Sequence, residues 1–320
     1  MRKLLTGILM IWLTSNCVYS QFDAQFSQYM HHTPGFNPAG VGESGMLDVT
    51  GQHRLHWVGM PNGGNTTLFS IHTPIKFAGI NQGIGINFQN DRIGLFINQA
   101  VHLQYALNFK VGNGNLRTGV QLGFLSIGFR GDSIRGPEVA IGDYHDISGD
   151  PAIPTTLSEG FGFDMGVGAM YTYKKMYAGI SYSHLNQPVI EWSDEHFYRP
   201  AGTIYLSGGY AHSLKNKKYV VRPSFLLKSD MVLFQAELSV LMHVNNQYWG
   251  GLSYRYGDAV AIMAGMEITN GLSIGYSYDI PASAMITASW GSHEVFLSYE
   301  MEIGTGGDSR RNSYKSIRIL

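Results

Sequence analysis

A serine between two glycines is the first feature of the sequence that could carry out chemistry. Residues 271–275 read Gly-Leu-Ser-Ile-Gly and match the G-x-S-x-G pattern in which hydrolases place a serine nucleophile. That nucleophile needs a strand that turns sharply into a helix. Here the same residues continue an alternation of apolar and small side chains up to Tyr278, which is typical of a strand. We therefore interpret Ser273 as a small strand residue that faces an interior, and we expect no catalysis from it.

A glycine-rich run at residues 160–168 is the second candidate, because phosphate-binding loops are rich in glycine. Its glycines stand at positions 160, 162, 166 and 168. All four are even-numbered, so on a strand they share one face, since successive side chains point to opposite faces. A loop that cradles phosphate would instead open a helix. The run therefore indicates a strand that leaves room on its inner face.

Metal-binding patterns are weak. The twelve histidines are scattered, His53 and His56 fall on opposite faces of a strand, and no His-Glu-x-x-His pattern occurs. Asp143, Asp146 and Asp150 share one segment and offer oxygen ligands for calcium, but they lack the alternate-position spacing of a calcium loop. We favour a plain extracellular loop there. The sequence predicts no catalytic residue, no metal and no cofactor.

The composition points to a membrane β-barrel. Of the 320 residues, 44% are apolar and only 14% are charged, while glycine and aromatic residues contribute 40 positions each. So few ions argue against a disordered chain and against a nucleic-acid partner. The mean hydropathy of −0.06 and the lack of a mature stretch of about 20 apolar residues argue against a helical membrane protein.

The first twenty residues are predicted to be a secretory signal peptide. Arg2 and Lys3 precede an apolar core at 4–13, and cleavage is expected after Ser20. A lipoprotein would need a small residue before Cys17, and the residues there fit poorly. Because Cys17 is the single cysteine, the expected mature chain contains none, and it carries 20 basic and 23 acidic residues, a net charge of −3. Disulfides and thiolate chemistry are thereby excluded.

Alternating residues predict the strands of the barrel. Residues 101–110 place large apolar side chains at odd positions and polar or small ones at even positions, and residues 178–184, 248–256 and 271–278 repeat the pattern. Period two over such lengths places one row against lipid and the other toward a lumen. The polar row is rich in Gly, Ser, Gln and Asn. Large inward side chains, such as Trp249 and Arg255 if they face inward, would favour a plugged barrel.

About fourteen such strands are expected between residues 46 and 302, beginning near residues 46, 64, 82, 96, 115, 160, 175, 202, 218, 231, 246, 259, 271 and 284. An even number places both termini on the same, periplasmic side. Connections after even-numbered strands should then be tight periplasmic turns, and they read Gly-Asn-Gly at 112–114, Lys-Lys at 174–175, Asn-Asn at 245–246 and Asn-Gly at 270–271. The long connections 130–159 and 186–200 should face the cell exterior.

The two ends of the mature chain are predicted to be accessory segments. We expect a periplasmic arm or a plug at 21–45, the all-β transmembrane barrel at 46–302, and a periplasmic tail at 303–320. Lysines of the turns and basic residues of the tail would make the periplasmic rim basic, a surface for a partner or merely solvated turns. The rim lysines are Lys174, Lys175, Lys215, Lys217 and Lys218.

Several motifs in order along the chain resemble the PorP/SprF family of Bacteroidetes outer-membrane proteins. The first is Phe-Ser-Gln-Tyr-Met at 26–30, followed by Asn-Pro-Ala-Gly at 37–40, and a later one is His-Leu-Asn-Gln-Pro at 184–188. The chain does not end on a terminal Phe or Trp, so its assembly signal is not evident. The motif residues taken as docking candidates are Phe26, Gln28, Tyr29, Asn37, Pro38, Arg54, Trp57, His184, Leu185, Gln187 and Pro188.

The resemblance implies a role without catalysis in type IX protein secretion and, in gliding species, in delivering adhesins to the cell surface. Expected partners are the outer-membrane lipid, the translocon, a periplasmic lipoprotein ring and the secreted adhesins or exported proteins. The alternative is a porin or transporter for small solutes, since a barrel of about fourteen strands is wide enough to hold an open lumen. An outer-membrane hydrolase is the third reading, and the motif search argues against it.

Overall fold

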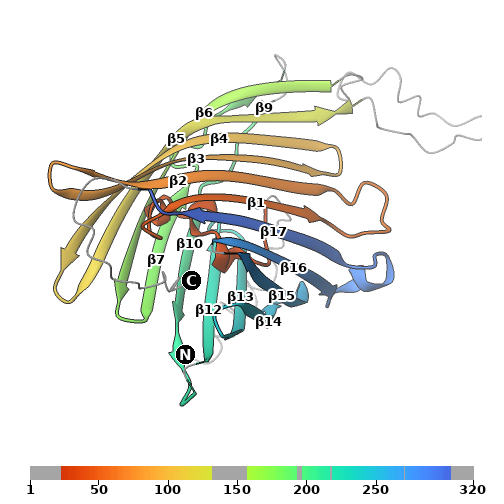
Figure 1. Ribbon diagram of the computed structural model, residues 1–320. Helices are drawn as coiled ribbons and strands as arrows, with labels where there is room; N and C mark the ends of the chain where they lie inside the picture. The colour runs from red at the N-terminus through yellow and green to blue at the C-terminus, as the bar shows by residue number, and fades with distance from the viewer. Residues whose placement is uncertain (1–22, 132–156, 193–196, 217, 270, 304–320) are drawn as a thin grey trace, which may run out of the picture.

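A computed structural model describes residues 23–131, 157–192, 197–216, 218–269 and 271–303, and it forms a closed antiparallel β-barrel (Figure 1). Fourteen strands make the wall. They are β1 (Leu47–Leu55), β2 (Asn65–Phe77), β3 (Ile80–Ile93), β4 (Phe96–Val111), β5 (Gly114–Arg130), β6 (Leu157–Tyr173), β7 (Met176–Ser183), β10 (Thr203–Tyr210), β12 (Tyr219–Ser229), β13 (Phe234–Val244), β14 (Tyr248–Arg255), β15 (Ala259–Thr269), β16 (Leu272–Pro281) and β17 (Ser292–Met301).

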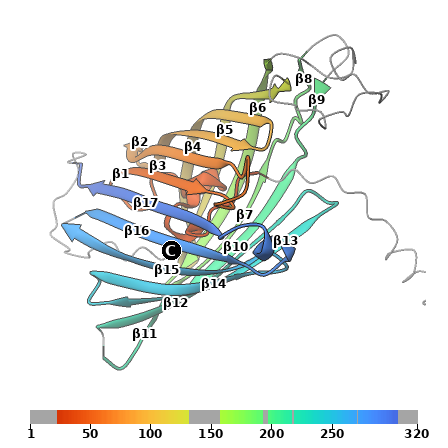
Figure 2. The same cartoon turned by 90° about the vertical axis from the view of Figure 1, so that its right-hand side faces the viewer.

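The first and last strands close the barrel. β1 pairs with β17 in continuous register from Leu47–Met301 to Leu55–His293, and Figure 2 shows the two strands side by side. Three short strands complete the described part of the chain: β11 (His212–Ser213) pairs with β12, while β8 (Ile190–Glu191) pairs with β9 (Phe197–Tyr198). The expected all-β barrel of about fourteen strands is therefore confirmed.

The alternation of side chains has the orientation that the sequence predicts. On β4, Leu103 lies exposed on the outer face while Gln104 is buried inside. On β14, Leu252 points outward, and Trp249 and Arg255 point inward. The outer face is thus the apolar surface that lipid requires, and the inner face is polar.

The two ends of the barrel differ in their connections. At one end, here called the hairpin end, β1 begins, β17 ends and the tight turns at 78–79, 112–113, 174–175 and 245–247 lie. Asn245 and Asn246 both adopt positive φ there, as a type I′ turn demands, and in the 174–175 turn Lys174 does so. The opposite end, called the loop end, carries the connections 56–64, 131–156, 184–202 and 282–291.

The expected start of the last strand, near residue 284, is wrong. Residues Ala284–Thr287 form a 3-10 helix, η6, because the Ser283 side chain accepts the Met285 N–H and caps its start. β17 begins only at Ser292, after Gly291 has turned the chain at φ 92°. The other thirteen expected starts lie within three residues of the observed ones.

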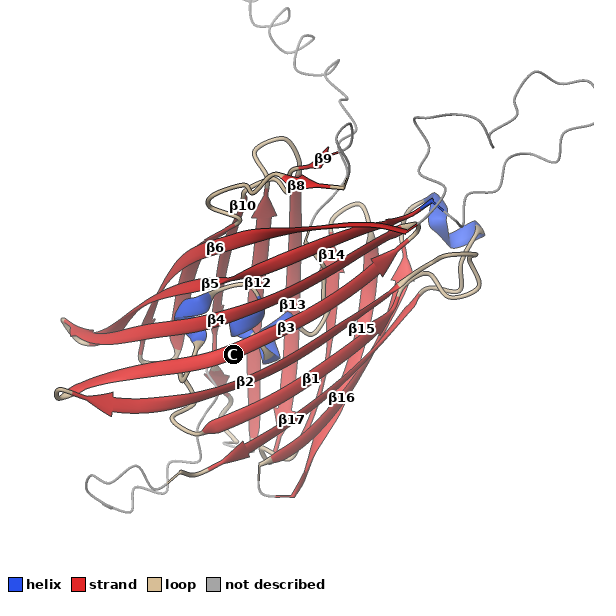
Figure 3. Cartoon of the chain, turned by 90° about the horizontal axis from the view of Figure 1, so that it is seen from above, coloured by secondary structure: helices blue, strands red, loops and turns tan. Residues whose placement is uncertain are grey.

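No helix in the described part of the chain is long and apolar enough to cross a membrane. Besides η6, it contains three 3-10 helices, η1 (Tyr29–His31), η2 (Thr33–Gly35) and η3 (Pro38–Gly40). They belong to residues 23–46, which we call the N-terminal segment. Residues 26–34 and 37–42 of it are buried, and Figure 3 shows its helices enclosed by the strands.

Candidate functional site

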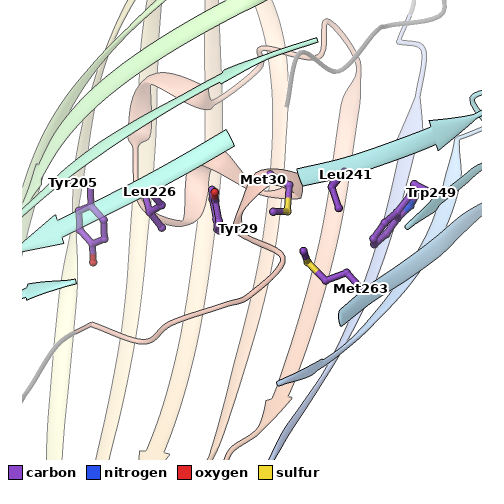
Figure 4. Close-up of a cluster of buried hydrophobic side chains, with 7 residues drawn as sticks. All are labelled: Tyr29, Met30, Tyr205, Leu226, Leu241, Trp249 and Met263. Carbon is purple, nitrogen blue, oxygen red and sulfur yellow. The ribbon is translucent and has the colours of Figure 1, made fainter. Parts of the chain in front are cut away.

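The N-terminal segment occupies the lumen, and a hydrophobic cluster anchors its middle. Tyr29 and Met30 of η1 pack against inward side chains of the wall (Figure 4). Phe36, which is partly buried, packs against the same cluster. The Tyr29 hydroxyl also lies 3.1 Å from Ser224 Oγ on β12. The wall residues of the cluster are Tyr205, Leu226, Leu241, Trp249 and Met263.

A buried ionic network holds the segment at Ser27. Its hydroxyl accepts hydrogen bonds from Arg54 and Arg255, each at 2.8 Å, and donates to Asp279 at 2.6 Å. Its backbone N–H donates to Glu294 at 2.8 Å. One hydroxyl can accept two bonds and donate one, so Ser27 is fully satisfied. The network reaches β1, β14, β16 and β17, and it therefore ties the segment to both sides of the β1–β17 seam.

A second network holds the start of the segment through His184. The two ring nitrogens of His184 lie 2.9 Å from Asp23 on the segment and 2.9 Å from Asp164 on β6. Asp164 also contacts His102 at 2.7 Å, and Lys228 donates to the backbone carbonyl of Asp23 at 3.0 Å. Because both nitrogens of His184 face carboxylates, the ring is bound as an imidazolium, which donates from both positions.

The electrostatics of this pair agree with its geometry. Burial disfavours the charged form of His184, but Asp23 and Asp164 outweigh that cost and raise its pKa to about 10. Burial likewise opposes the charge on Asp23, yet His184, Tyr205 and Lys228 hold its pKa below the usual range. Asp23 and His184 are therefore both charged near neutral pH, and their contact holds the start of the segment.

The end of the segment, around η3, fits notches made by glycines of the wall. Asn37 Nδ2 donates to the backbone carbonyls of Ala169 and Ile180, both at 3.3 Å, and its Oδ1 accepts the Ala39 N–H at 3.0 Å. A Cβ on Gly168 would collide with Asn37 Oδ1. The inward even-numbered face of β6 predicted from residues 160–168 is thus observed, and Gly168 makes room for the segment.

Arg117 of β5 closes the contact at this end. Its guanidinium donates to the backbone carbonyl of Ala39 at 2.8 Å and to that of Val41. A Cβ on Gly119 would meet the backbone of residues 38 and 39, and one on Gly83 would meet the Val41 carbonyl. The wall therefore follows the backbone of the segment closely, as expected of a fixed plug.

A cavity remains between the segment and the loop end. Its volume is about 560 Å³, and residues 23–26 of the segment form part of its lining. Charged groups and aromatic rings both reach it, including Arg54, His56, Tyr198, Lys228 and Asp258. In the described residues, no group of three or more His, Cys, Asp or Glu side chains is arranged so that it could hold a metal ion. Asp143, Asp146 and Asp150 lie outside the described residues.

The structure brings most of the motif residues into the lumen. Seven of them are buried inside: Phe26, Gln28, Tyr29, Asn37, Pro38, Arg54 and His184. Pro188 is buried against Gly162, Trp57 is half-buried, and Leu185 and Gln187 are exposed at the loop end. The rim lysines Lys174, Lys175, Lys215 and Lys218 are exposed at the hairpin end, and Lys217 lies outside the described residues.

Sequence reasoning missed the wall residues that bind the segment. The missed residues are charged side chains at inward positions of the strands: Asp164, Lys228, Glu237, Asp279 and Glu294. The sequence did contain a signal for them, because each stands at an inward position of the alternating pattern. A charge at such a position needs a partner inside the barrel. The partners of Lys228, Glu237, Asp279 and Glu294 on the N-terminal segment lie more than two hundred residues away along the chain, so one sequence does not pair them.

The fold and the filled lumen define the class: this is an outer-membrane β-barrel whose own N-terminal segment occupies its interior. The chain belongs to the PorP/SprF family of type IX secretion system membrane proteins, whose family model matches residues 18–299. This confirms the resemblance stated from the motifs. The family and the barrel are those of a secretion or porin-type membrane protein rather than of an enzyme family.

Solved outer-membrane barrels are similar to the chain only at low identity. Omp33 of Acinetobacter baumannii shares 7% identity over 81% of this chain and 98% of its own, with a TM-score of 0.47. The toluene transporter TbuX of Ralstonia pickettii shares 10% over 86% and 93%, with a TM-score of 0.47. No curated protein matches the chain by sequence. The functions of these barrels are therefore not transferred to this one.

Proposed function

We propose that the protein is a non-enzymatic outer-membrane component of type IX secretion that recruits the translocon or the periplasmic ring and supports delivery of gliding adhesins or exported proteins to the surface. Family membership supports the pathway. The observation that carries the mode of action is the filled lumen: the segment packs on η1 and bonds to the wall at Ser27, Asp23 and Asn37. A barrel closed in this way acts through its surfaces.

The lengths of the connections support an orientation for the proposed role. The tight turns are assigned to the periplasm and the long connections to the cell exterior, so β1 would begin and β17 would end on the periplasmic side. The exposed lysines of the hairpin end would then face periplasmic partners. Lys174 and Lys175 share one turn, and Lys215 and Lys218 share another. A basic rim attracts an acidic partner over about 8–10 Å at physiological ionic strength.

Deletion of the gene with complementation tests the proposal. We expect selective loss of surface adhesins or exported enzymes, with membrane integrity and small-solute uptake unchanged. An intact secretome with slower uptake of a solute would instead favour the porin alternative, whose supporting feature is the cavity at the loop end. Conductance of the purified barrel in planar bilayers provides the second measurement, and the filled lumen predicts no stable open channel.

Charge reversal tests the docking surface. Lys174→Glu with Lys175→Glu should weaken capture of the periplasmic partners while the barrel stays folded, since both side chains are exposed. Arg92→Glu, an exposed charge toward the loop end, is the matched control. Unchanged capture by the lysine variant would remove the basic rim from the proposal but leave the secretion role to the deletion experiment.

A further inference from the structure

The outer face of β1–β4 changes from apolar to polar at one level of the wall. On β2, Phe69 points outward, and the next outward residue toward the loop end is Thr67. On β4 the corresponding change is from Val101 to Gln99. The residues directly after the change are register partners across the four strands: His53, Thr67, Asn90 and Gln99. Because β1–β4 lie side by side (Figure 3), these residues form one continuous polar row on the outside of the barrel.

The apolar part of these strands has the length of one membrane crossing. On β4, every outward position from Val101 to Val111 carries an apolar or aromatic side chain. On β2, the outward positions from Phe69 to Phe77 are apolar except for Thr73. A transmembrane β-strand needs about 9–11 residues, and both of these stretches supply them. The polar row therefore lies just beyond the hydrocarbon, at the level of the lipid headgroups on the loop-end side.

The outward polar side chains of this row are hydrogen-bonded to one another. His53 Nδ1 lies 2.8 Å from Thr67 Oγ1, and Gln99 Nε2 donates to Asn90 Oδ1 at 3.0 Å. The next row toward the loop end adds the register partners Asn65 and Arg92. We call these six residues the headgroup patch: His53, Asn65, Thr67, Asn90, Arg92 and Gln99. The connections beside the patch, 56–64 and 94–95, are described, and they leave His53, Arg92 and Gln99 exposed.

The headgroup patch offers one permanent cation and several neutral hydrogen-bonding groups. The Arg92 guanidinium presents a fixed fork of donors, which suits a phosphate bound in a bidentate manner. The amides of Asn65, Asn90 and Gln99 both donate and accept hydrogen bonds, as the hydroxyl groups of a sugar require. With strands about 4.8 Å apart, the patch extends about 14 Å from β1 to β4, which is wider than a single phosphate. Its chemistry and its width fit a phosphorylated saccharide.

We propose that the headgroup patch binds the phosphorylated saccharide headgroup of a glycolipid in the outer leaflet, while the acyl chains of that lipid lie on the apolar outer face of β1–β4. The placement in the outer leaflet rests on the orientation given under the proposed function. Arg92 binds a phosphate of the headgroup, and the amides on β2, β3 and β4 bind its sugar hydroxyls. A phospholipid would engage Arg92 but leave most of these amides without a partner. The site therefore selects for the sugar as well as for the charge.

Lipid binding to the purified full-length barrel tests this inference. Native mass spectrometry in detergent gives the affinity for lipid A, a phosphorylated and acylated glucosamine disaccharide, and for phosphatidylglycerol. We expect lipid A to bind more tightly. Arg92→Gln should weaken lipid A binding at least about tenfold, because it loses hydrogen bonds between two charged groups. Asn90→Ala with Gln99→Ala should weaken the binding of lipid A but not that of phosphatidylglycerol.

Lys76→Gln is the matched control, because Lys76 is an exposed cation of β2 at the hairpin end. It should leave lipid A binding unchanged, and every variant should keep the heat-modifiable migration of a folded barrel. Equal affinity for the two lipids, or unchanged lipid A binding by Arg92→Gln, would overturn the inference. Because the assay contains no secretion partner, either result would leave the secretion role to the deletion experiment. Conversely, an intact secretome after deletion would remove the secretion role, while a measured preference for lipid A would still support the headgroup patch.

Discussion

His184 is the residue whose replacement should free the start of the N-terminal segment. We consider His184→Asn, because His184 adopts φ 53° and both His and Asn tolerate this region, so the backbone is matched. Asparagine is neutral and shorter, and it loses both 2.9 Å contacts to carboxylates. Removing one partner of a buried ion pair costs about 3–5 kcal/mol. At about 1.4 kcal/mol per factor of ten, local opening around Asp23 should rise at least about 100-fold.

The assay is the rate at which a small maleimide modifies Phe26→Cys in the purified barrel, with and without His184→Asn, because position 26 is buried and its modification needs local opening. Thiol modification through a local opening reports the population of the open form when reclosing is fast. The rest of the segment remains bound at Ser27 and Asn37, so the barrel itself should keep its heat-modifiable migration. His53→Asn is the matched control, because His53 lies on the outer face and bonds to Thr67 at 2.8 Å. A rate change below about threefold with His184→Asn would refute the reasoning.

The contact between Asp23 and His184 should depend on pH. The pKa of His184 rises from its ordinary 6.5 to about 10 in the folded protein, so its stabilisation is complete below pH 6.5 and is lost as the pH rises through about 10. The pKa of Asp23 is lowered from 3.8, so its contribution is complete above that pH and is lost on acidification. Reactivity of Phe26→Cys, corrected for thiolate fraction, should be lowest between pH 3.8 and 6.5 and rise in alkali. A flat corrected profile up to pH 11 would contradict this.

Further variants test the other contacts of the lumen. Gly168→Ala should displace Asn37 and raise proteolysis of the segment, whereas Gly250→Ala, which meets only the Met263 carbonyl at 3.5 Å, should not. Asn37→Ala removes three hydrogen bonds of about 1 kcal/mol each, so denaturant release of the segment should shift by about 3 kcal/mol. Burial and the neighbouring arginines lower the pKa of His56 to about 3, so this neutral ring stabilises above pH 6.5 and its contribution falls on acidification; NMR titration of the ring should show no protonation at pH 5.

The wall of the barrel is predictable because its rules are local. Period-two patterning marks each strand, and Asn-Asn at 245–246 or Gly-Asn at 112–113 marks each turn. The start of the last strand was placed too early because residues 284–286 carry apolar side chains, but Ser283 caps a 3-10 helix there. The local pattern did not reveal that a polar cap would compete with the strand.

The interior is less predictable because its partners are distant in sequence. The motif residues of the segment were recognisable, yet Ser27 meets Glu294 across 267 positions and Asp23 meets His184 across 161. The alternation of side chains identifies the inward face, and charged residues on that face indicate that oppositely charged or hydrogen-bonding partners lie inside the barrel. Which partner each charge meets depends on the register and shear of the closed barrel, which become defined only when β1 pairs with β17.

The charged interior also explains how the seam keeps its register. Arg54 of β1 and Glu294 of β17 are register partners, and their side chains meet at 3.3 Å. A slip of one residue would turn Arg54 toward lipid, where a charge is destabilising. Ser27 and Gln28 both donate backbone N–H groups to Glu294, so the segment binds best when this pair is aligned. A buried ion pair adds little net stability, but it is well suited to specifying one alignment. Binding of the N-terminal segment therefore favours the correct β1–β17 register, and the correct register in turn favours binding of the segment. A barrel closed out of register should fail to retain the segment.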